Sequence, residues 1–419
     1  MMERILARPN LLQAIKRVEE NKGSHGVDQM TTKDLRNHLV ENWTTILTQI
    51  RSGTYQPKPV RRVEIPKPNG GIRKLGIPTV TDRFIQQAIA QQLTLVFDPA
   101  FSEFSYGFRP NRRAHTAVKQ ARAYIKEGYR WVVDMDLEKF FDKVNHDRLM
   151  AKLASKIKDK ALLRLIRRFL QAGVLENGLV RPITEGAPQG GPLSPLLSNI
   201  VLDELDKELE KRGHKFVRYA DDFQIYVKSK RAGQRVMESI TTFIEKKLRL
   251  KVNREKSMIA RPWKRKFLGF SFTSNKKQPK IRLAKQSVER FKARIRKLTS
   301  RKQRIAMEQR IAKLNSYLNG WLGYYQLIET PSNLKELESW LHRRLRMIRW
   351  KEWKLPRTKK RKLISLGISP QKAYEWSNSR KAYWRIAKSP ILHIALGTKY
   401  WSSQGLKSIS ARYEILRHT

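Results

Sequence analysis

The pattern of apolar and polar residues predicts alternating helices and strands over roughly the first 275 residues. Apolar residues recur at helical spacing in residues 4–21, from Thr32 onward, and in 82–95, 114–127, 146–175, 196–212 and 232–248. Strands are expected on both sides of Gly70–Gly71, in the apolar run 131–137, in residues 216–227, and near Met258 and Phe267. This mixture predicts an α/β fold.

Beyond about residue 281 the pattern becomes purely helical. Three successive sets of apolar residues recur at a spacing of three or four and predict a three-helix unit ending near residue 353. The last segment, 354–419, is basic and rich in aromatic residues. We therefore divide the chain into residues 1–280, 281–353 and 354–419.

The composition points to a polyanionic partner. The chain has 88 Lys and Arg against 37 Asp and Glu, a formal net charge of +51. Such a surface attracts nucleic acid. A ribosomal or membrane-surface protein is the plainer alternative, but neither usually combines this charge with 40% hydrophobic residues and ten tryptophans.

Cysteine is absent from the sequence, which excludes disulfides and thiolate zinc sites. Any metal ion must then be bound by oxygen or imidazole. No apolar run reaches the roughly eighteen residues of a membrane span, and the N-terminus lacks the apolar core of a signal peptide. We expect no membrane association and a cytoplasmic location.

The sharpest chemical signal is the segment Tyr219-Ala220-Asp221-Asp222. Two adjacent carboxylates at a turn between apolar strands repel each other unless a cation neutralises them. Mg²⁺ is the natural cation for such oxygen ligands. Most Asp-Asp pairs are only solvated turn residues, so this pair alone would be weak support for a metal site.

A second source of carboxylates lies in the apolar run 131–137. Asp134 and Asp136 are two residues apart, so in a strand both would point to the same face. Either could meet the Asp221–Asp222 pair, and the spacing alone does not choose between them.

The order of several motifs resembles a known family. Asp136 with an aromatic residue at 141, the PQGGPLSP loop at 188–195 and the YADD hairpin resemble the palm of reverse transcriptases. SYGFRPNRRAHTAV, RKLGIP and YLNGWLGYY extend the resemblance to group II intron-encoded reverse transcriptases, also called maturases. The chain is most similar to the compact bacterial class C type, which lacks an endonuclease domain.

The resemblance implies a right-hand polymerase. Residues 1–280 would form the fingers and palm with an N-terminal extension, and 281–353 the thumb or maturase (X) domain. Residues 354–419 would form a small, mainly helical DNA-binding domain. Because no zinc-binding endonuclease segment follows, we expect that the protein does not cut a second DNA strand.

The resemblance also assigns a metal site. Asp136, Leu137, Asp221 and Asp222 would hold two Mg²⁺ ions, with Mn²⁺ able to substitute, and the three aspartates would be catalytic. Asp134 would then be a structural residue.

The resemblance also implies which residues bind the nucleotide. Lys67 and Arg73 would grip the triphosphate of the incoming dNTP, and Phe141 would exclude a 2′-hydroxyl. Gln189 and Gly190 would lie against the nucleotide, since glycine permits close backbone approach. The plainer alternatives are a solvated hairpin for Lys67 and Arg73, ordinary core packing for Phe141, and a plain turn for Gln189 and Gly190.

Nucleic-acid contacts are implied for Arg109, for Lys256 in VNREKS and for Gly269 in the primer-holding turn FLGF. An exposed surface charge is the plainer interpretation for each cation.

The implied function is RNA-directed DNA synthesis on an RNA template with a DNA primer. The implied partners are dNTPs, target DNA and a group II intron RNA whose splicing and retromobility the protein assists, in a monomer or dimer. Three alternatives remain open: a reverse transcriptase released from its intron, a maturase that only assists splicing, and a non-specific basic RNA-binding protein.

Overall fold

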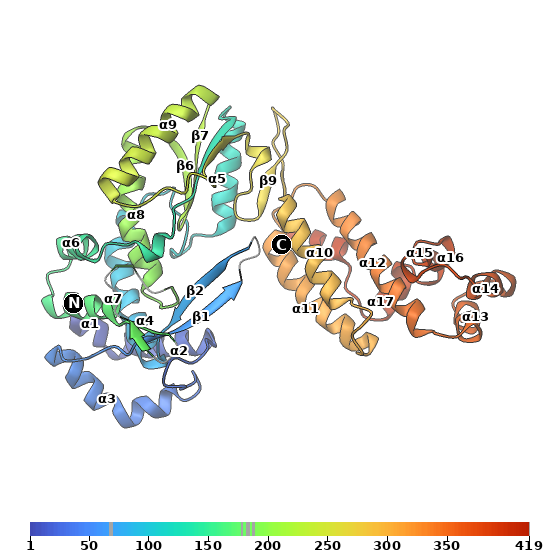
Figure 1. Ribbon diagram of the computed structural model, residues 1–419, viewed down its shortest axis with the longest axis horizontal. Helices are drawn as coiled ribbons and strands as arrows, with labels where there is room; N and C mark the ends of the chain where they lie inside the picture. The colour runs from blue at the N-terminus through green and yellow to red at the C-terminus, as the bar shows by residue number, and fades with distance from the viewer. Residues whose placement is uncertain (67–69, 177–178, 182–184, 187–188, 419) are drawn as a thin grey trace. The chain divides into compact units, whose positions relative to one another are not determined.

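The computed structural model describes residues 1–66, 70–176, 179–181, 185–186 and 189–418. The chain forms two compact units, Met1–Arg261 and Pro262–Thr419. Figure 1 shows the elements of each unit.

The first unit begins with helices. They are α1 (Met2–Leu6), α2 (Arg8–Glu20), α3 (Leu35–Ser52) and α4 (Val80–Phe97). The single helix predicted over 4–21 was wrong: Ala7 is extended, with φ −61° and ψ 134°, and separates two helices. Pro9, which lacks an N–H, lies in the first turn of α2, where no intrahelical donor is needed.

A four-stranded sheet has the order β2-β1-β4-β5. Its strands are β1 (Val60–Pro66), β2 (Ile72–Ile77), β4 (Val174–Glu176) and β5 (Leu179–Arg181). The predicted hairpin is confirmed as β1 and β2, which pair antiparallel. The helical segment predicted to reach residue 175 ends earlier, because Gly173 has a φ of 77° and leads into β4.

A second sheet of the first unit has the order β6-β7-β3-β8. Its strands are β3 (Trp131–Met135), β6 (Lys215–Tyr219), β7 (Asp222–Val227) and β8 (Met258–Ala260). The helices of this region are α5 (Ala114–Lys126), α6 (His146–Lys156), α7 (Lys160–Gln171), α8 (Ser194–Lys211) and α9 (Lys230–Phe243).

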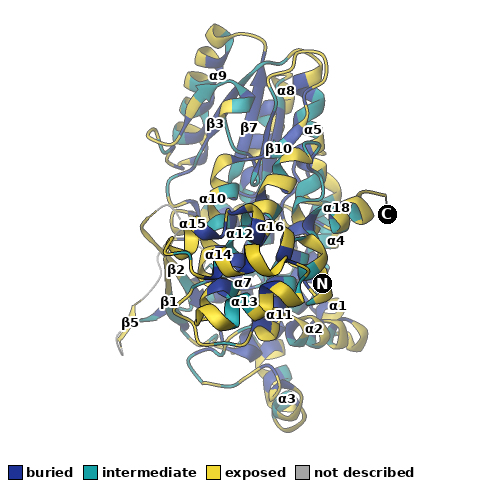
Figure 2. Ribbon diagram, turned by 90° about the vertical axis from the view of Figure 1, so that its right-hand side faces the viewer, coloured by how far each residue is buried: buried dark blue, intermediate teal, exposed yellow. Residues whose placement is uncertain are grey.

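The two faces of this sheet differ in chemistry. Phe223 and Ile225 of β7 pair with Met135 and Val133 of β3, and all four belong to the main hydrophobic core. Because side chains alternate along a strand, the opposite face carries Asp134 with Gln224, and Tyr226. Figure 2 shows that β3 and β7 are largely buried. The core therefore supports a polar face on which charged residues can gather.

The second unit begins with a short hairpin of β9 (Phe270–Phe272) and β10 (Ile281–Leu283). Three long helices follow: α10 (Lys285–Leu298), α11 (Met307–Tyr325) and α12 (Ser332–Glu352). The remaining helices are α13 (Pro356–Ser365), α14 (Pro370–Ser377), α15 (Tyr383–Ile386), α16 (Pro390–Ala395), α17 (Thr398–Ser403) and α18 (Ile409–His418). The structure confirms the prediction that the chain beyond about residue 281 is mainly helical.

Residues 262–280, which we assigned to the polymerase part, lie in the second unit. The reason is local: β9 pairs with β10, and the Ser287 hydroxyl of α10 donates to the Gly269 carbonyl at 2.7 Å. The functional boundaries at 280 and 353 remain predictions. Within the described part of the chain, no helix is both long and apolar enough to cross a bilayer.

Candidate active site and nucleic-acid surface

The YADD segment forms the tight turn that the sequence predicts. Tyr219 pairs with Asp222, so only Ala220 and Asp221 lie between β6 and β7. Ala220 has a φ of 58°, which is uncommon for a residue with a side chain. The turn therefore holds Asp221 at its tip and Asp222 at the start of β7, both partly exposed.

Sheet register brings the other carboxylate to this turn. Met135 of β3 pairs with Phe223 of β7 in an antiparallel ladder. Extending that register by one residue places Asp136 opposite Asp222, where α-carbons are about 5 Å apart. Asp136 and the two turn aspartates thus lie at the same end of the sheet.

A turn at residues 253–257 fixes the backbone of Asp136. The Asp136 N–H donates to the Ser257 hydroxyl at 3.1 Å, and the Asn253 N–H donates to the Asp136 carbonyl at 2.8 Å. The Asn253 side chain also accepts from the Lys256 N–H at 3.2 Å. Sequence reasoning missed Asn253 and Ser257, because short polar residues near a strand are common in loops.

Lys256 faces the same carboxylate. Its Nζ lies 3.8 Å from Asp136 Oδ2, and the two side chains are 66% and 46% exposed. At that exposure the attraction is weak, about 1 kcal/mol or less. The structure thus places Lys256 beside the predicted metal site, with its ammonium offsetting part of the negative charge.

The donors at this site fit a hard divalent cation. Asp136, Asp221 and Asp222 offer only oxygen, which Mg²⁺ prefers. Among the described residues, no three acidic or histidine side chains are gathered closely enough to form a metal cage by themselves. Mg²⁺ is usually bound by one or two carboxylates together with water and substrate phosphates, so a complete protein cage is not required.

A buried arginine positions the turn. Arg218 and Asp206 are both fully buried, and Arg218 Nε donates to Asp206 at 2.7 Å. Other guanidinium N–H groups reach the Ser105 hydroxyl at 2.7 Å, the Asn199 side chain at 3.0 Å and the Ala220 carbonyl at 3.0 Å. Arg218 therefore connects the turn to two other segments, α8 and the loop that contains Ser105.

Gly107 lies directly against the turn. A Cβ added at Gly107 would lie 2.4 Å from the Ala220 nitrogen, closer than real Cβ contacts. The Asn199 side chain donates to the Gly107 carbonyl at 2.9 Å, and the Tyr106 N–H donates to the Arg218 carbonyl at 2.8 Å. Part of the SYGFRP motif is therefore a support for the YADD turn.

Asp134 has a different environment from Asp136. It is 7% exposed and accepts a hydrogen bond from Gln224 at 3.2 Å. Gln224 in turn accepts from the Tyr226 hydroxyl at 2.8 Å. These contacts fit the structural role that the resemblance gave to Asp134.

The predicted nucleotide-binding residues are partly described. Arg73 is exposed on β2, whereas Lys67 lies outside the described residues. The Gln189 carbonyl accepts from the Gly76 N–H at 2.9 Å, and a Cβ on Gly190 would lie 2.6 Å from the Gly76 carbonyl oxygen. The glycine loop thus packs on the strand that carries Arg73.

Phe141 and Leu137 lie close to Asp136 in the chain. Phe141 is half-buried in the short turn Phe140–Asp142, and its ring meets that of Phe140 edge-on with centroids 5.2 Å apart. Leu137 is 5% exposed and forms a bridge with Val252. Their assigned roles remain predictions.

The structure argues against a nucleic-acid contact for Arg109. Its side chain is 5% exposed, with Nε 2.7 Å from the Asp98 carboxylate. Three further N–H donors bond the carbonyls of Ser102, Ser105 and Asp98. Because the guanidinium is occupied in holding the 98–105 loop, we drop the predicted contact.

Gly269 lies in the second unit, in a tight turn between Phe267 and Phe270. Leu268 and Gly269 have φ values of 50° and 85°, which glycine favours at the second position. The Tyr324 hydroxyl donates to the Leu268 carbonyl at 2.8 Å. The FLGF and YLNGWLGYY motifs therefore form one local structure.

Cations and aromatic rings alternate on α12 and its neighbours. The Arg343 guanidinium lies 3.9 Å from the ring centre of Trp384, which is 36% exposed. Lys292, Arg296 and Arg344 lie 5.6–5.9 Å from the ring centre of Trp340. We call these six residues the arginine–tryptophan face. Such a surface suits contact with phosphates and stacking on bases.

Comparison with known families identifies the family of this chain. Residues 65–272 match the family described as "Reverse transcriptase (RNA-dependent DNA polymerase)". Residues 288–364 match "Group II intron, maturase-specific domain". The chain belongs to the group II intron reverse transcriptases. For this family the enzyme class is RNA-directed DNA polymerase, a nucleotidyltransferase, and such polymerases generally use divalent metal ions.

Curated relatives of this group II intron reverse transcriptase are moderately similar. Protein YkfC of Escherichia coli (strain K12) is 33% identical over 297 residues, covering 61% of this chain and 78% of the relative. The group II intron-encoded protein LtrA of Lactococcus lactis subsp. cremoris is 33% identical over 339 residues. That match covers 64% of this chain and 55% of LtrA, so the chain spans about half of LtrA.

A solved structure also matches. One chain of the "Partial Cas6-RT-Cas1--Cas2 complex" is 28% identical and covers 57% of this chain and 42% of that chain, with a TM-score of 0.36. This score is too low to add to the fold.

Proposed function

We propose that this protein copies RNA into cDNA by nucleotidyl transfer with two Mg²⁺ ions, and that it binds a group II intron RNA to assist splicing and retromobility. The observation that supports the catalytic part is the sheet register, which pairs Met135 with Phe223 and thereby leads Asp136 and Asp222 to the same end of the sheet as the Asp221 turn. Three carboxylates at one strand end are unfavourable unless divalent cations join them.

Asp136, Asp221 and Asp222 would hold the ions, with the Leu137 carbonyl as a further oxygen ligand. The chemistry supplied by two bound Mg²⁺ ions is activation of the primer 3′-hydroxyl and stabilisation of the leaving pyrophosphate. Lys256, 3.8 Å from Asp136, would move toward phosphate oxygens once the carboxylate is neutralised.

The other residues of the first unit would bind and orient substrates. Exposed Arg73, with Lys67, would contact the triphosphate, because a planar donor and a point cation suit phosphate oxygens. Gln189 and Gly190 would contact the nucleotide, and Phe141 would exclude the 2′-hydroxyl. In the second unit, the turn at Gly269 would hold the primer, and the arginine–tryptophan face would bind RNA.

The test is primer extension on an RNA template with a DNA primer, Mg²⁺ and dNTPs. Asp222→Asn keeps the side-chain size and removes the charge, so extension should fall about a thousandfold or more, since metal stabilisation contributes several kcal/mol. Asp147→Asn is the matched control, because Asp147 is 78% exposed on α6 and pairs only with Arg167 among the described residues.

RNA binding separates the alternatives. Both variants should bind structured RNA as the wild type does, because the Asp222 change leaves the second unit intact. If the wild type binds intron RNA but extends no primer, the polymerase proposal fails and the splicing-only alternative takes its place. If binding shows no preference for intron RNA over other structured RNA, the maturase part fails.

A further inference from the structure

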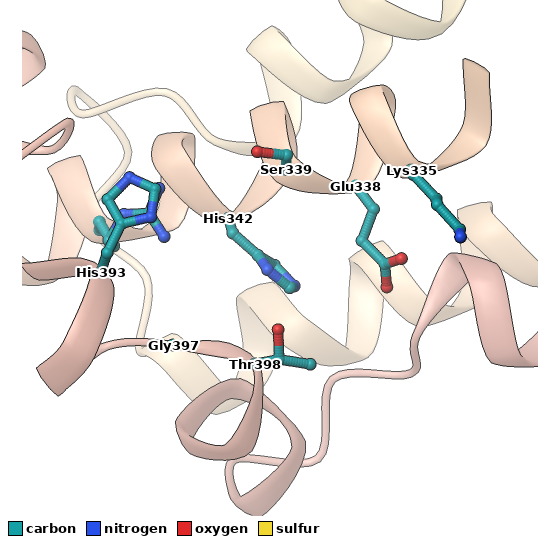
Figure 3. Close-up of a pocket in the computed structure, with 8 residues that line it drawn as sticks. Lys335, Glu338, Ser339, His342, His393, Gly397 and Thr398 are labelled. Carbon is teal, nitrogen blue, oxygen red and sulfur yellow. The ribbon is translucent and has the colours of Figure 1, made fainter. Parts of the chain in front are cut away.

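A small polar pocket lies in the second unit, apart from every motif considered above. It has a volume of about 280 Å³, and its lining includes Lys335, Ser339, His342, His393 and Thr398. Figure 3 shows His342 and Glu338 pointing from α12 into this space, opposite Thr398.

His342 points into the pocket from α12. It is 7% exposed, and neither ring nitrogen forms a hydrogen bond with any described residue. Burial lowers the pKa of His342, and the neighbouring Arg346 and His393 lower it further, while Glu338 acts in the opposite direction. A neutral imidazole that can donate one N–H therefore faces the pocket.

Arg346 supplies a fixed positive charge. It is 3% exposed; its Nε donates to the Ala387 carbonyl at 2.9 Å, and another guanidinium nitrogen lies 3.0 Å from His393 Nε2. Arginine has no acceptor, so His393 Nε2 must accept and His393 must be neutral, with its proton on Nδ1. Both imidazoles are therefore uncharged hydrogen-bonding groups.

Glu338 is the one opposing charge on the lining, and its carboxylate is already engaged. Its oxygens accept from the Ile409 N–H at 2.9 Å, the Ser410 N–H at 3.3 Å and the Ser410 hydroxyl at 2.5 Å. With Lys335 on the rim and Arg346 inside, the formal charge of the lining is two positive and one negative, or +1. A singly charged anion would balance it.

We propose that this pocket binds one phosphodiester group of a nucleic-acid backbone. A phosphodiester carries one negative charge, whereas free phosphate carries between one and two at neutral pH, so the diester matches the lining better. Lys335 and Arg346 would supply charge, and His342, Ser339 and Thr398 would donate hydrogen bonds. This inference rests on the proposed nucleic-acid binding by the second unit and adds a discrete anchoring point to it.

The direct test uses full-length protein with ¹⁵N-labelled histidine. Dimethyl phosphate, a diester monoanion, should shift the ring signals of His342 and His393 and leave those of the other six histidines unchanged, the chain having eight. A parallel titration with inorganic phosphate distinguishes binding of a phosphodiester from binding of free phosphate. A shift with inorganic phosphate alone, or with neither probe, would overturn the proposal.

Variants show whether the signal comes from the pocket. Thr398→Glu places a negative charge on its exposed rim and should abolish the shift; Ser339→Asp should do the same from α12. Ser403→Glu adds the same charge on α17 but about 140° around the helix axis, and should leave the shift unchanged. Persistence of the shift in both pocket variants would contradict the assignment, with thermal unfolding confirming that each variant is folded.

Binding to a DNA-primed RNA template then connects the pocket to nucleic acid. Loss of one phosphate contact lowers the slope of log affinity against log salt by about one, so Thr398→Glu should show that loss and Ser403→Glu should not. Equal slopes in the two variants would exclude the backbone as the ligand. Primer extension by the wild type tests the polymerase function separately. If the wild type extends the primer but the two slopes are equal, only the pocket proposal fails.

Discussion

The two compact units use arginine in opposite ways. In the first unit, Arg218 is fully buried, and its donors bond Asp206, Ser105, Asn199 and the Ala220 carbonyl. In the second unit, Arg343 stacks on the partly exposed ring of Trp384. The first arrangement fixes the geometry of one turn, whereas the second builds a surface from many similar contacts. Single substitutions should therefore be severe in the first unit and mild in the second.

Gly107→Ala should give the largest effect of the remaining tests. The added methyl would lie 2.4 Å from the Ala220 nitrogen, so the turn that carries Asp221 must move. A displacement near 1 Å at a catalytic centre costs about a hundredfold in rate, which we expect in kcat for primer extension.

Gly320→Ala provides the control for that substitution. An added Cβ at Gly320 meets nothing within 4 Å, and the residue lies within α11. Its rate should be unchanged, and its stability should rise by up to about 1 kcal/mol. If the Gly107→Ala enzyme extended primers as fast as the wild type, single substitutions in the first unit would not be severe, and the contrast between the two units would fail.

Arg109→Ala should lower stability without changing nucleic-acid binding. The substitution removes the 2.7 Å pair with Asp98 and the bonds to the 98–105 loop. We expect a loss of about 2 kcal/mol in the free energy of unfolding, measured by urea denaturation. A weaker RNA affinity with unchanged stability would instead restore the contact that the sequence predicted.

Phe141→Ala tests a smaller, steric effect. Removing the half-buried ring should leave room for a 2′-hydroxyl, so discrimination between dNTP and rNTP in kcat/KM should fall about tenfold. The dNTP rate of the same variant is the internal reference. Unchanged discrimination would remove Phe141 from the proposed gate.

Trp384→Ala should have the smallest effect. Loss of one stacking ring from the arginine–tryptophan face should weaken RNA binding by about 1 kcal/mol, roughly fivefold, with an unchanged salt slope. Ile394→Ala is the control, because Ile394 is an exposed apolar residue of α16. A much larger loss would show that the second unit also depends on single residues.

The parts of the fold predicted correctly are those with strong periodicity. The run 131–137 and the segment 216–227 are apolar enough to require burial, and the polar pair between the two halves of 216–227 required a turn. The helices of the second unit followed from their regular spacing. The break at Ala7 and the short strand β4 were missed, because local backbone angles and a single glycine decided them.

The candidate site was less predictable than the fold. Nothing in the sequence distinguishes a buried arginine from an exposed one, so Arg109 was placed on nucleic acid and Arg218 was overlooked. Asn253 and Ser257 act through backbone hydrogen bonds to Asp136, a residue more than a hundred positions away. Contacts between residues so far apart in the chain depend on the topology of the fold, which local residue patterns do not predict.

The pairing of Lys256 with Asp136 has a practical consequence for handling the protein. An ammonium 3.8 Å from the carboxylate acts as an internal counter-ion when magnesium is absent. Because both groups are largely exposed, the pair is weak enough for a divalent cation to displace it. Purification and storage in chelator should therefore leave the fold intact, and activity should return as soon as magnesium and nucleotide are added together.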